Sequence, residues 1–222
     1  MKKPSQRKET LKYYFSVEGE TEQWYLKWLQ DTINNTDQSV YKVSFDHRIE
    51  KDPVSRAKSL NINSETIIWH YSDRESNEDV HTKQFLETID RLKQAQELGK
   101  DIEYRFGYSN FSFDLWIVLH KTYLGSSLHD RSKYLPHINK AYGEAFETMG
   151  KYKKKDNFHR VLSKLTLADV ISAIKNAERI MQNNKDVGYK LKEYRGYEYY
   201  DENPSLMIWE SIKQILSDCE LI

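Results

Sequence analysis

The chain of 222 residues has very little cysteine: only Cys219 is present, so neither a disulfide framework nor a cysteine-based metal site can be built. It also lacks an apolar run near the roughly 18 residues that a membrane-spanning helix requires. The basic residues 1–10 are not followed by the uninterrupted apolar stretch of a signal peptide. We therefore expect a soluble protein of the reducing cytoplasm, with no membrane partner.

The chain also lacks an excess of charge of either sign, because 34 lysine and arginine residues match 34 aspartate and glutamate residues. Without net charge there is no overall field to attract nucleic acid, so binding to a polyanion needs a local basic patch. The densest candidate is "KYKKK" at 151–155, whose ordinary interpretation is a solvated, exposed connection. Aromatic residues, by contrast, are plentiful: 16 tyrosines and 5 tryptophans are available for a core or for a base-stacking surface.

Strand-like and helix-like patterns alternate through the first half of the chain. We expect strands at 12–18, 40–47, 65–73 and 101–109, with helices between them at 21–33, 53–60 and 79–99. This alternation predicts an α/β fold with a parallel sheet and helices on its faces.

The second half of the chain has a different pattern. From residue 111 onward the strand signal mostly disappears, and the apolar residues recur with helical spacing at 111–123, 167–182 and 204–219. We expect an α/β core over 1–110 and a mostly helical portion over 111–222, integrated with the core, with a single domain as the alternative. No repeat or low-complexity linker separates the two portions.

Acidic residues follow two of the expected strands. Glu18 ends the first, before Gly19, which would allow a sharp turn into the helix, and Asp73 ends the third. Ligands of parallel sheets bind beyond the carboxyl ends of the strands. Asp73 and Glu75 face the same side if the chain stays extended. Gathered carboxylates repel one another unless a cation joins them, and oxygen ligands select Mg²⁺ or Mn²⁺ over zinc. These positions indicate a metal site.

A structural interpretation competes for the acids after Gly19. Glu20 and Glu22 fall in the first turn of the expected helix, where they would complement the positive end of its dipole, with Thr21 as a cap. That interpretation is preferred for Glu20. Capping does not account for strand-end acids in two separate elements, although spacing alone leaves the metal site and its absence about equally open.

Two short motifs resemble those of the Toprim fold. "VEGETE" at 17–22 and "SDRE" at 72–75 are similar to the Toprim arrangement, in which an E-G-x-x-E/D strand end and a D-x-D strand end hold a divalent metal. Glu75 stands where Toprim proteins usually carry aspartate. The fold occurs in topoisomerases, primases and a group of nucleases.

A longer segment, "YSNFSFDLWIVLHK" at 108–121, resembles the S-N-P-x-F-E-x-W-L-L-x-H segment of the RloB/AbiLii family, Toprim-related proteins found with restriction and abortive-infection systems. The later "GKYKKKDNF", "AIKNAERI" and "ENPSLMIW" resemble that family's Y-K-K, n-A and N-P-S-T segments in the same order. The resemblance covers nearly the whole chain. It departs at Phe111, where the family usually has proline, and at Asp114, where it has glutamate.

The resemblance implies a Mg²⁺- or Mn²⁺-dependent endonuclease of antiviral abortive-infection immunity. Its substrate would be RNA, such as tRNA or another structured RNA, and it would act alone or beside a partner ATPase. The metal ligands would be Glu18, Asp73 and Glu75, the catalytic set would add Glu22, Asp114 and His120, and nucleic-acid contacts would come from Lys153, Lys154 and Asn110.

Each of the last residues also has a structural interpretation. Asn110 fits a helix N-cap, and His120 fits a hydrogen-bonded histidine at the end of an apolar helix. Trp116, in the middle of that helix, is expected in the core that joins the two halves.

Two other functions stay open. The protein could be a non-catalytic regulatory or adaptor subunit of an ATPase-containing defence complex, or a Toprim nuclease that nicks DNA, since no motif reads a 2′-hydroxyl or a base edge. The retained acids favour an enzyme, because an adaptor need not keep three carboxylates in repulsive proximity.

Overall fold

The computed structural model describes residues 8–128 and 130–222. Its main sheet has five strands in the order β2-β1-β3-β4-β7. Four are mutually parallel: β1 (Thr10–Val17), β2 (Lys42–Ile49), β3 (Thr66–Arg74) and β4 (Ile102–Asn110). The expected α/β fold with a parallel sheet is therefore confirmed, and every predicted strand of the first half is present.

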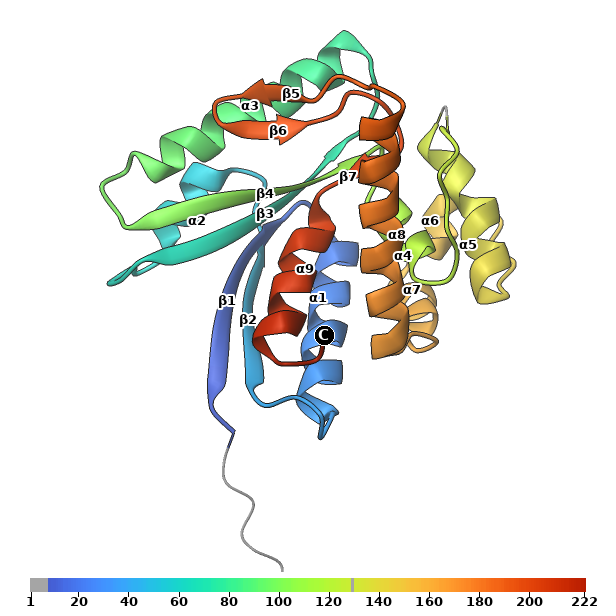
Figure 1. Ribbon diagram of the computed structural model, residues 1–222, viewed down its shortest axis with the longest axis horizontal. Helices are drawn as coiled ribbons and strands as arrows, with labels where there is room; N and C mark the ends of the chain where they lie inside the picture. Colours follow the sequence, from blue (N-terminus) through green and yellow to red (C-terminus); the bar gives the residue numbers. More distant parts are fainter. Residues whose placement is uncertain (1–7, 129) are drawn as a thin grey trace, which may run out of the picture.

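Helices cover both faces of this sheet (Figure 1). On one face lie α2 (Pro53–Ser59) and α3 (Asp79–Gln96). On the other lie α1 (Glu20–Asn35) and α9 (Ile208–Asp218). Alternate side chains of β3 serve the two faces, because successive residues of a strand point to opposite sides: Ile68 packs with α2 and α3, whereas Trp69 and Tyr71 pack with α1 and α9.

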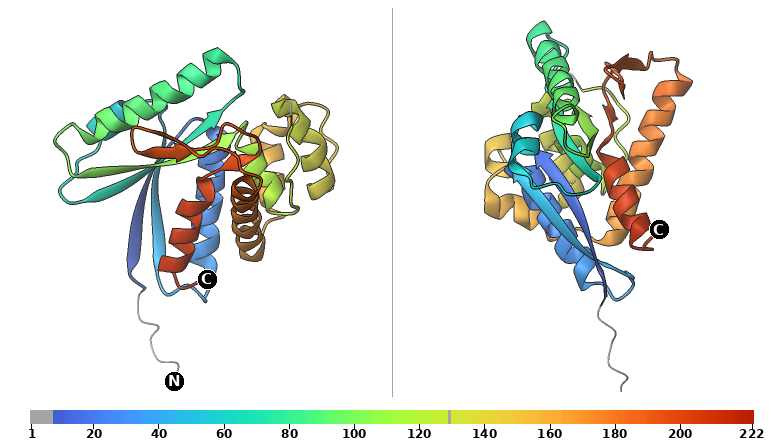
Figure 2. Two further views of the ribbon diagram at one scale, coloured as in Figure 1. Left: turned by 45° about the horizontal axis from the view of Figure 1, so that its top comes forward. Right: turned by 90° about the vertical axis from the view of Figure 1, so that its left-hand side faces the viewer.

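The remaining helices gather near the ends of β3 and β4, as the two further views show (Figure 2). They are α4 (Asp114–Leu119), α5 (Tyr134–Tyr142), α6 (Met149–Tyr152), α7 (Lys155–Leu162) and α8 (Leu167–Asp186), with a 3₁₀ turn at Arg131–Lys133. The second half is mostly helical, as predicted. One continuous core contains residues of both halves, from Phe15 of β1 to Cys219.

The second half also contains three strands that the sequence pattern did not predict. β5 (Lys192–Tyr194) and β6 (Tyr197–Tyr199) form a hairpin over α3, and β7 (Ser205–Leu206) pairs antiparallel with the end of β4. The expected helix at 204–219 is therefore wrong at its start, since 205–206 extend the sheet and α9 begins at Ile208. Among the described residues, no helix has the length and apolar content needed to cross a membrane.

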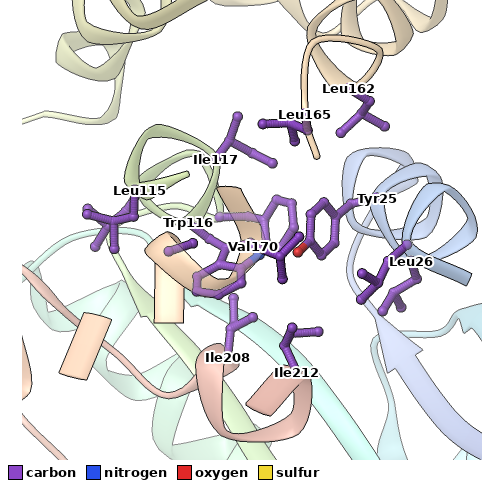
Figure 3. Close-up of a cluster of buried hydrophobic side chains, with 14 of the residues drawn as sticks. Tyr25, Leu26, Leu115, Trp116, Ile117, Leu162, Leu165, Val170, Ile208 and Ile212 are labelled. Atoms are coloured by element: carbon purple, nitrogen blue, oxygen red, sulfur yellow. The ribbon is translucent and has the colours of Figure 1, made fainter. Parts of the chain in front are cut away.

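Trp116 lies in the part of the core where helices of the first and second halves of the chain pack together (Figure 3). Its side chain on α4 is fully buried, between Tyr25 and Leu26 of α1, Val170 of α8 and Ile212 of α9. The ring lies edge-on to Tyr25, with the centroids 6.2 Å apart. This placement agrees with the core role expected of Trp116.

Candidate active site

Glu18 follows β1 directly, and the neighbouring strand β3 holds its carboxylate. The hydroxyl of Ser72 donates a hydrogen bond to Oε1 at 3.0 Å, and the backbone N–H of Asp73 donates to Oε2 at 3.1 Å. The two strands are parallel neighbours, so their carboxyl ends lie at the same edge of the sheet. The structure thus brings Glu18 and Asp73 together, as the strand-end rule predicts.

Two expectations about the turn after β1 are wrong. Gly19 has extended backbone angles, φ −152° and ψ −178°, which any residue can adopt. Space favours glycine here, because a Cβ at this position would lie 3.2 Å from Oε2 of Glu22, which would have to shift slightly. Thr21 does not cap α1, since the helix begins at Glu20 and Gly19 is its N-cap. Instead the Thr21 hydroxyl donates to Oε2 of Glu22 at 3.0 Å.

Glu22 is buried, and its carboxylate belongs to the site rather than to the helix dipole alone. Burial raises the pKa of Glu22 above its ordinary value, and the nearby carboxylate of Glu18 adds to this rise. The Glu22 backbone N–H, the Thr21 hydroxyl and the Lys153 ammonium oppose it. Glu20, in contrast, is exposed on the first turn of α1.

Asp73 has the most strongly perturbed carboxyl of the site. Burial raises its pKa well above the ordinary value, and the carboxylates of Glu18, Glu22 and Asp114 raise it further. The Lys153 ammonium acts in the opposite direction. We call Glu18, Glu22, Asp73 and Asp114 the acidic cluster.

Asp114 enters the acidic cluster from α4, as the first residue of that helix. Its side chain is buried, and Oδ2 accepts a hydrogen bond from the Ser112 hydroxyl at 2.6 Å. The other oxygen, Oδ1, is buried without a hydrogen-bond partner among the described residues. A buried carboxylate oxygen without a donor is unfavourable unless a cation or water meets it.

Lys153 is the basic residue that contacts the acidic cluster. Its Nζ lies 3.0 Å from Oδ2 of Asp114. Burial acts to lower the pKa of Lys153, but Asp114, Asp73 and Glu22 together hold it above its ordinary value. The interpretation of "KYKKK" as a solvated, exposed connection holds for Lys151, Lys154 and Lys155, which are exposed. It is wrong for the rest of the segment, which spans the end of α6 and the start of α7, because Tyr152 is fully buried and Lys153 contacts Asp114.

Glu75 lies beside the acidic cluster and has basic partners of its own. Its carboxylate pairs with Arg131 at 3.2 Å and with His81 at 3.4 Å, and its side chain is partly exposed. It lines the same pocket of about 560 Å³ as Glu18 and Asp73. Burial is the main cause of the raised pKa of Glu18, and the negative charge of Glu75 adds to the rise.

Lys51 also lines this pocket, although no sequence motif pointed to it. Lys51 comes two residues after β2, and its positive charge lowers the pKa of Glu18 against the larger effect of burial. Lys51 could have been found by the rule that identified Glu18 and Asp73, because it also follows the carboxyl end of a strand of the parallel sheet.

A contact between the Asn110 side chain and nucleic acid does not fit the placement of this residue. The side chain is fully buried at the end of β4, and its Nδ2 donates to the carbonyls of Tyr200 at 2.9 Å and Glu202 at 3.0 Å and to the hydroxyl of Ser205 at 3.0 Å. It is not an N-cap either, because Phe113 precedes α4. Asn110 holds the segment that leads into β7.

His120 lies in the core, away from the acidic cluster, so a direct catalytic role does not fit its placement. Nδ1 lies 2.8 Å from the carbonyl oxygen of Trp116, and Nε2 lies 3.1 Å from the Tyr25 hydroxyl. Burial lowers its pKa to about 4, which keeps the ring neutral. The charged groups that act on it are Asp169 and Lys121.

The donor chemistry of the acidic cluster fits Mg²⁺ or Mn²⁺. All the donors are oxygens, burial and then mutual repulsion raise the pKa values of Glu22 and Asp73, and Oδ1 of Asp114 has no hydrogen-bond donor among the described residues. As the side chains lie, however, the described part of the chain contains no group of three or more His, Cys, Asp or Glu residues arranged to hold a metal ion. Metal binding would therefore require the carboxylates to move toward one another.

The fold and this site together define an α/β protein with a cluster of buried and partly buried carboxylates at the carboxyl ends of a parallel sheet. The chain belongs to the RloB-like protein family, whose model matches residues 13–215. The match includes the acidic cluster and Lys153, and it confirms the family resemblance drawn from the motifs. No curated protein and no solved structure matches the chain.

Proposed function

We propose that this protein is a metal-dependent endonuclease of the Toprim type that cleaves RNA, such as tRNA or another structured RNA, in antiviral abortive infection. One observation carries the proposal: the segment after β1 and the elements α1, β3 and α4 bring four carboxylates close enough for their charges to act on one another, and burial together with this repulsion raises the pKa of Glu22 and Asp73. Side chains in such an arrangement are unfavourable for folding and are typical of a functional site. It acts alone or beside a partner ATPase.

In the proposed reaction, Glu18 and Asp73 would hold a divalent metal ion together with Asp114 or Glu75. A divalent metal ion bound there would supply Lewis-acid polarisation of a phosphoryl oxygen and would stabilise charge on the leaving oxygen. Glu22 suits the role of general base, since its raised pKa makes its carboxylate a better proton acceptor at neutral pH. Ser72 and the Asp73 amide orient Glu18.

The test is incubation of the purified protein with total RNA and with supercoiled plasmid DNA, in Mg²⁺, in Mn²⁺ and in EDTA. We expect fragmentation of RNA with either metal and none with EDTA. Nicking of the plasmid without RNA cleavage would show that the substrate is DNA and not RNA. Absence of cleavage of both substrates, also after addition of an ATPase encoded beside the gene, would favour the non-catalytic adaptor.

Lys154 is expected to contact the phosphate backbone of the substrate. It is exposed at the start of α7, next to the residue that reaches the acidic cluster, and the described residues form no ion pair with it. Lys154→Gln should weaken RNA binding and reduce the slope of log K against log salt by about 0.7 to 0.9, the value of one phosphate contact. Fluorescence anisotropy at several salt concentrations measures this slope.

The matched control is Lys93→Gln, an exposed lysine 14 residues beyond the start of α3 and thus about 20 Å along that helix. Its slope should equal that of the parent. Equal slopes for the two variants would return Lys154 to the role of a solvated surface residue.

A further inference from the structure

Lys153 supplies the positive charge of its ammonium to the acidic cluster in the metal-free protein. Its ammonium lies 3.0 Å from Oδ2 of Asp114, while its side chain remains 38% exposed. Asp73 and Glu22 are also close enough to act on its charge. The Lys153 stem is flexible and its ammonium is strongly hydrated, so the attraction of the carboxylates, and not the shape of the backbone, keeps the ammonium beside Asp114.

The backbone that carries Lys153 is fixed, so only its side chain can change place easily. The preceding residue, Tyr152, is fully buried, and so is Phe158 on the first turns of α7. The Lys153 backbone N–H donates to the carbonyl of Met149 at 2.9 Å. A rotation of the side chain is therefore enough to move the ammonium out of the acidic cluster and into solvent.

Lys153 and a divalent metal ion compete for the same oxygens. Asp114 offers one oxygen to Lys153 and has a second, buried oxygen without a donor. A cation drawn to this oxygen would meet the ammonium at a distance of a few ångströms, where like charges repel strongly in a partly dry site. The carboxylates can approach one another around a divalent cation only when the ammonium has left.

We infer that Lys153 is a built-in counter-ion that occupies the acidic cluster in the metal-free protein and is displaced when metal binds. Displacement frees its ammonium at the edge of the site, beside Lys154, where it can bind a phosphate of the substrate. Metal loading thus prepares the protein for RNA. The inference rests on the proposed metal site and adds to it an order of events: metal first, phosphate second.

The first test measures the affinity for Mn²⁺, from the electron paramagnetic resonance signal of free Mn²⁺, and uses no RNA. Lys153→Met removes the charge and keeps the length of the side chain, so Mn²⁺ should bind at least about tenfold more tightly than to the parent. Lys154→Met, which removes the neighbouring exposed charge, is the control and should change the affinity less than about twofold. Unchanged or weaker Mn²⁺ binding by Lys153→Met would overturn the inference.

The second test uses the parent protein and so does not depend on the folding of a variant. Acetylation of lysines by a water-soluble active ester, read residue by residue by mass spectrometry, should be several-fold faster at Lys153 with Mn²⁺ than with EDTA. Lys154 should react equally in both conditions. Equal reactivity of Lys153 with and without bound Mn²⁺ would show that the ammonium stays in place and would overturn the inference.

The outcomes separate this inference from the proposed function. A protein that cleaves RNA with metal but shows neither effect at Lys153 contradicts only the inference. A protein that shows both effects and cleaves no nucleic acid contradicts only the nuclease. Absence of Mn²⁺ binding to the parent and to Lys153→Met would contradict both.

Discussion

Asp73→Asn is expected to abolish RNA cleavage while the protein stays as stable as the parent or becomes slightly more stable. The substitution keeps the shape of the side chain and removes one charge. Burial and the carboxylates of Glu18, Glu22 and Asp114 make the ionised form of Asp73 unfavourable in the folded protein. The loss of activity follows from the loss of a proposed metal ligand, which carries the largest effect that we expect.

The contribution of Asp73 to the free energy of unfolding decreases as the pH rises. Because the folded protein raises the pKa of Asp73, it binds the proton more tightly than the unfolded chain does. Protonated Asp73 therefore stabilises the folded parent below about pH 4, the ordinary carboxyl pKa. This stabilisation is lost as the pH rises from there through the higher pKa of the folded protein. The stability of Asp73→Asn relative to the parent should increase over the same range, as urea unfolding at several pH values would show.

Added Mg²⁺ should raise the melting temperature of the parent, because a ligand that binds only the folded state stabilises it by RT ln(1 + [L]/Kd), about 2.7 kcal/mol at 100 times Kd. This gain should shrink in Asp73→Asn. The control Asp37→Asn changes an exposed aspartate in the loop after α1 and should keep the full response. An Asp73→Asn protein that is destabilised in EDTA yet keeps the parent's Mg²⁺ response would contradict the metal site.

Trp116→Ala is expected to lower the free energy of unfolding by about 3–5 kcal/mol, as truncation of a buried aromatic residue does. The ring is fully buried where α1, α4, α8 and α9 meet, so its loss leaves a cavity between both halves of the chain. Urea denaturation followed by circular dichroism measures the change, and soluble yield should fall with it.

The control for this substitution is Trp28→Ala. Trp28 on α1 is partly exposed, so the surrounding residues and water can fill its place, and its loss should cost less than that of Trp116. A loss below about 1 kcal/mol for Trp116→Ala would contradict the buried joint between the halves.

The parallel sheet was predictable because its strands and helices are local patterns of apolar residues. The proximity of Glu18 and Asp73 followed from the same source, since parallel strands end at one edge. Asp114 and Lys153 were placed in the site by resemblance alone. Their contact, across 39 residues, depends on how α4 and α6 pack, and no local pattern encodes such packing.

The strands of the second half were missed for reasons that can be named. β7 has two residues, too few for an alternating pattern. The hairpin of β5 and β6 turns at Arg195 and Gly196, both with positive φ, where arginine stands in place of the asparagine or aspartate usual in such turns. The sequence left two interpretations open for Asn110 and His120, because a polar residue beside an apolar run has the same appearance whether it binds a ligand or the protein's own backbone.

The pairing of β4 with β7 has a consequence for how the protein folds during synthesis. The Asn110 side chain cannot form its hydrogen bonds until the carbonyls of residues 200–202 have been synthesised. Ser109 cannot pair in the sheet until Leu206 has been synthesised. At roughly 5–20 residues per second, a ribosome needs about 5 to 20 s to add the 96 residues from 111 to 206. Throughout that interval the edge of β4 and the apolar face of the sheet lack their final cover. The nascent chain is therefore exposed to aggregation until β7 and α9 have been synthesised and can pack on the sheet.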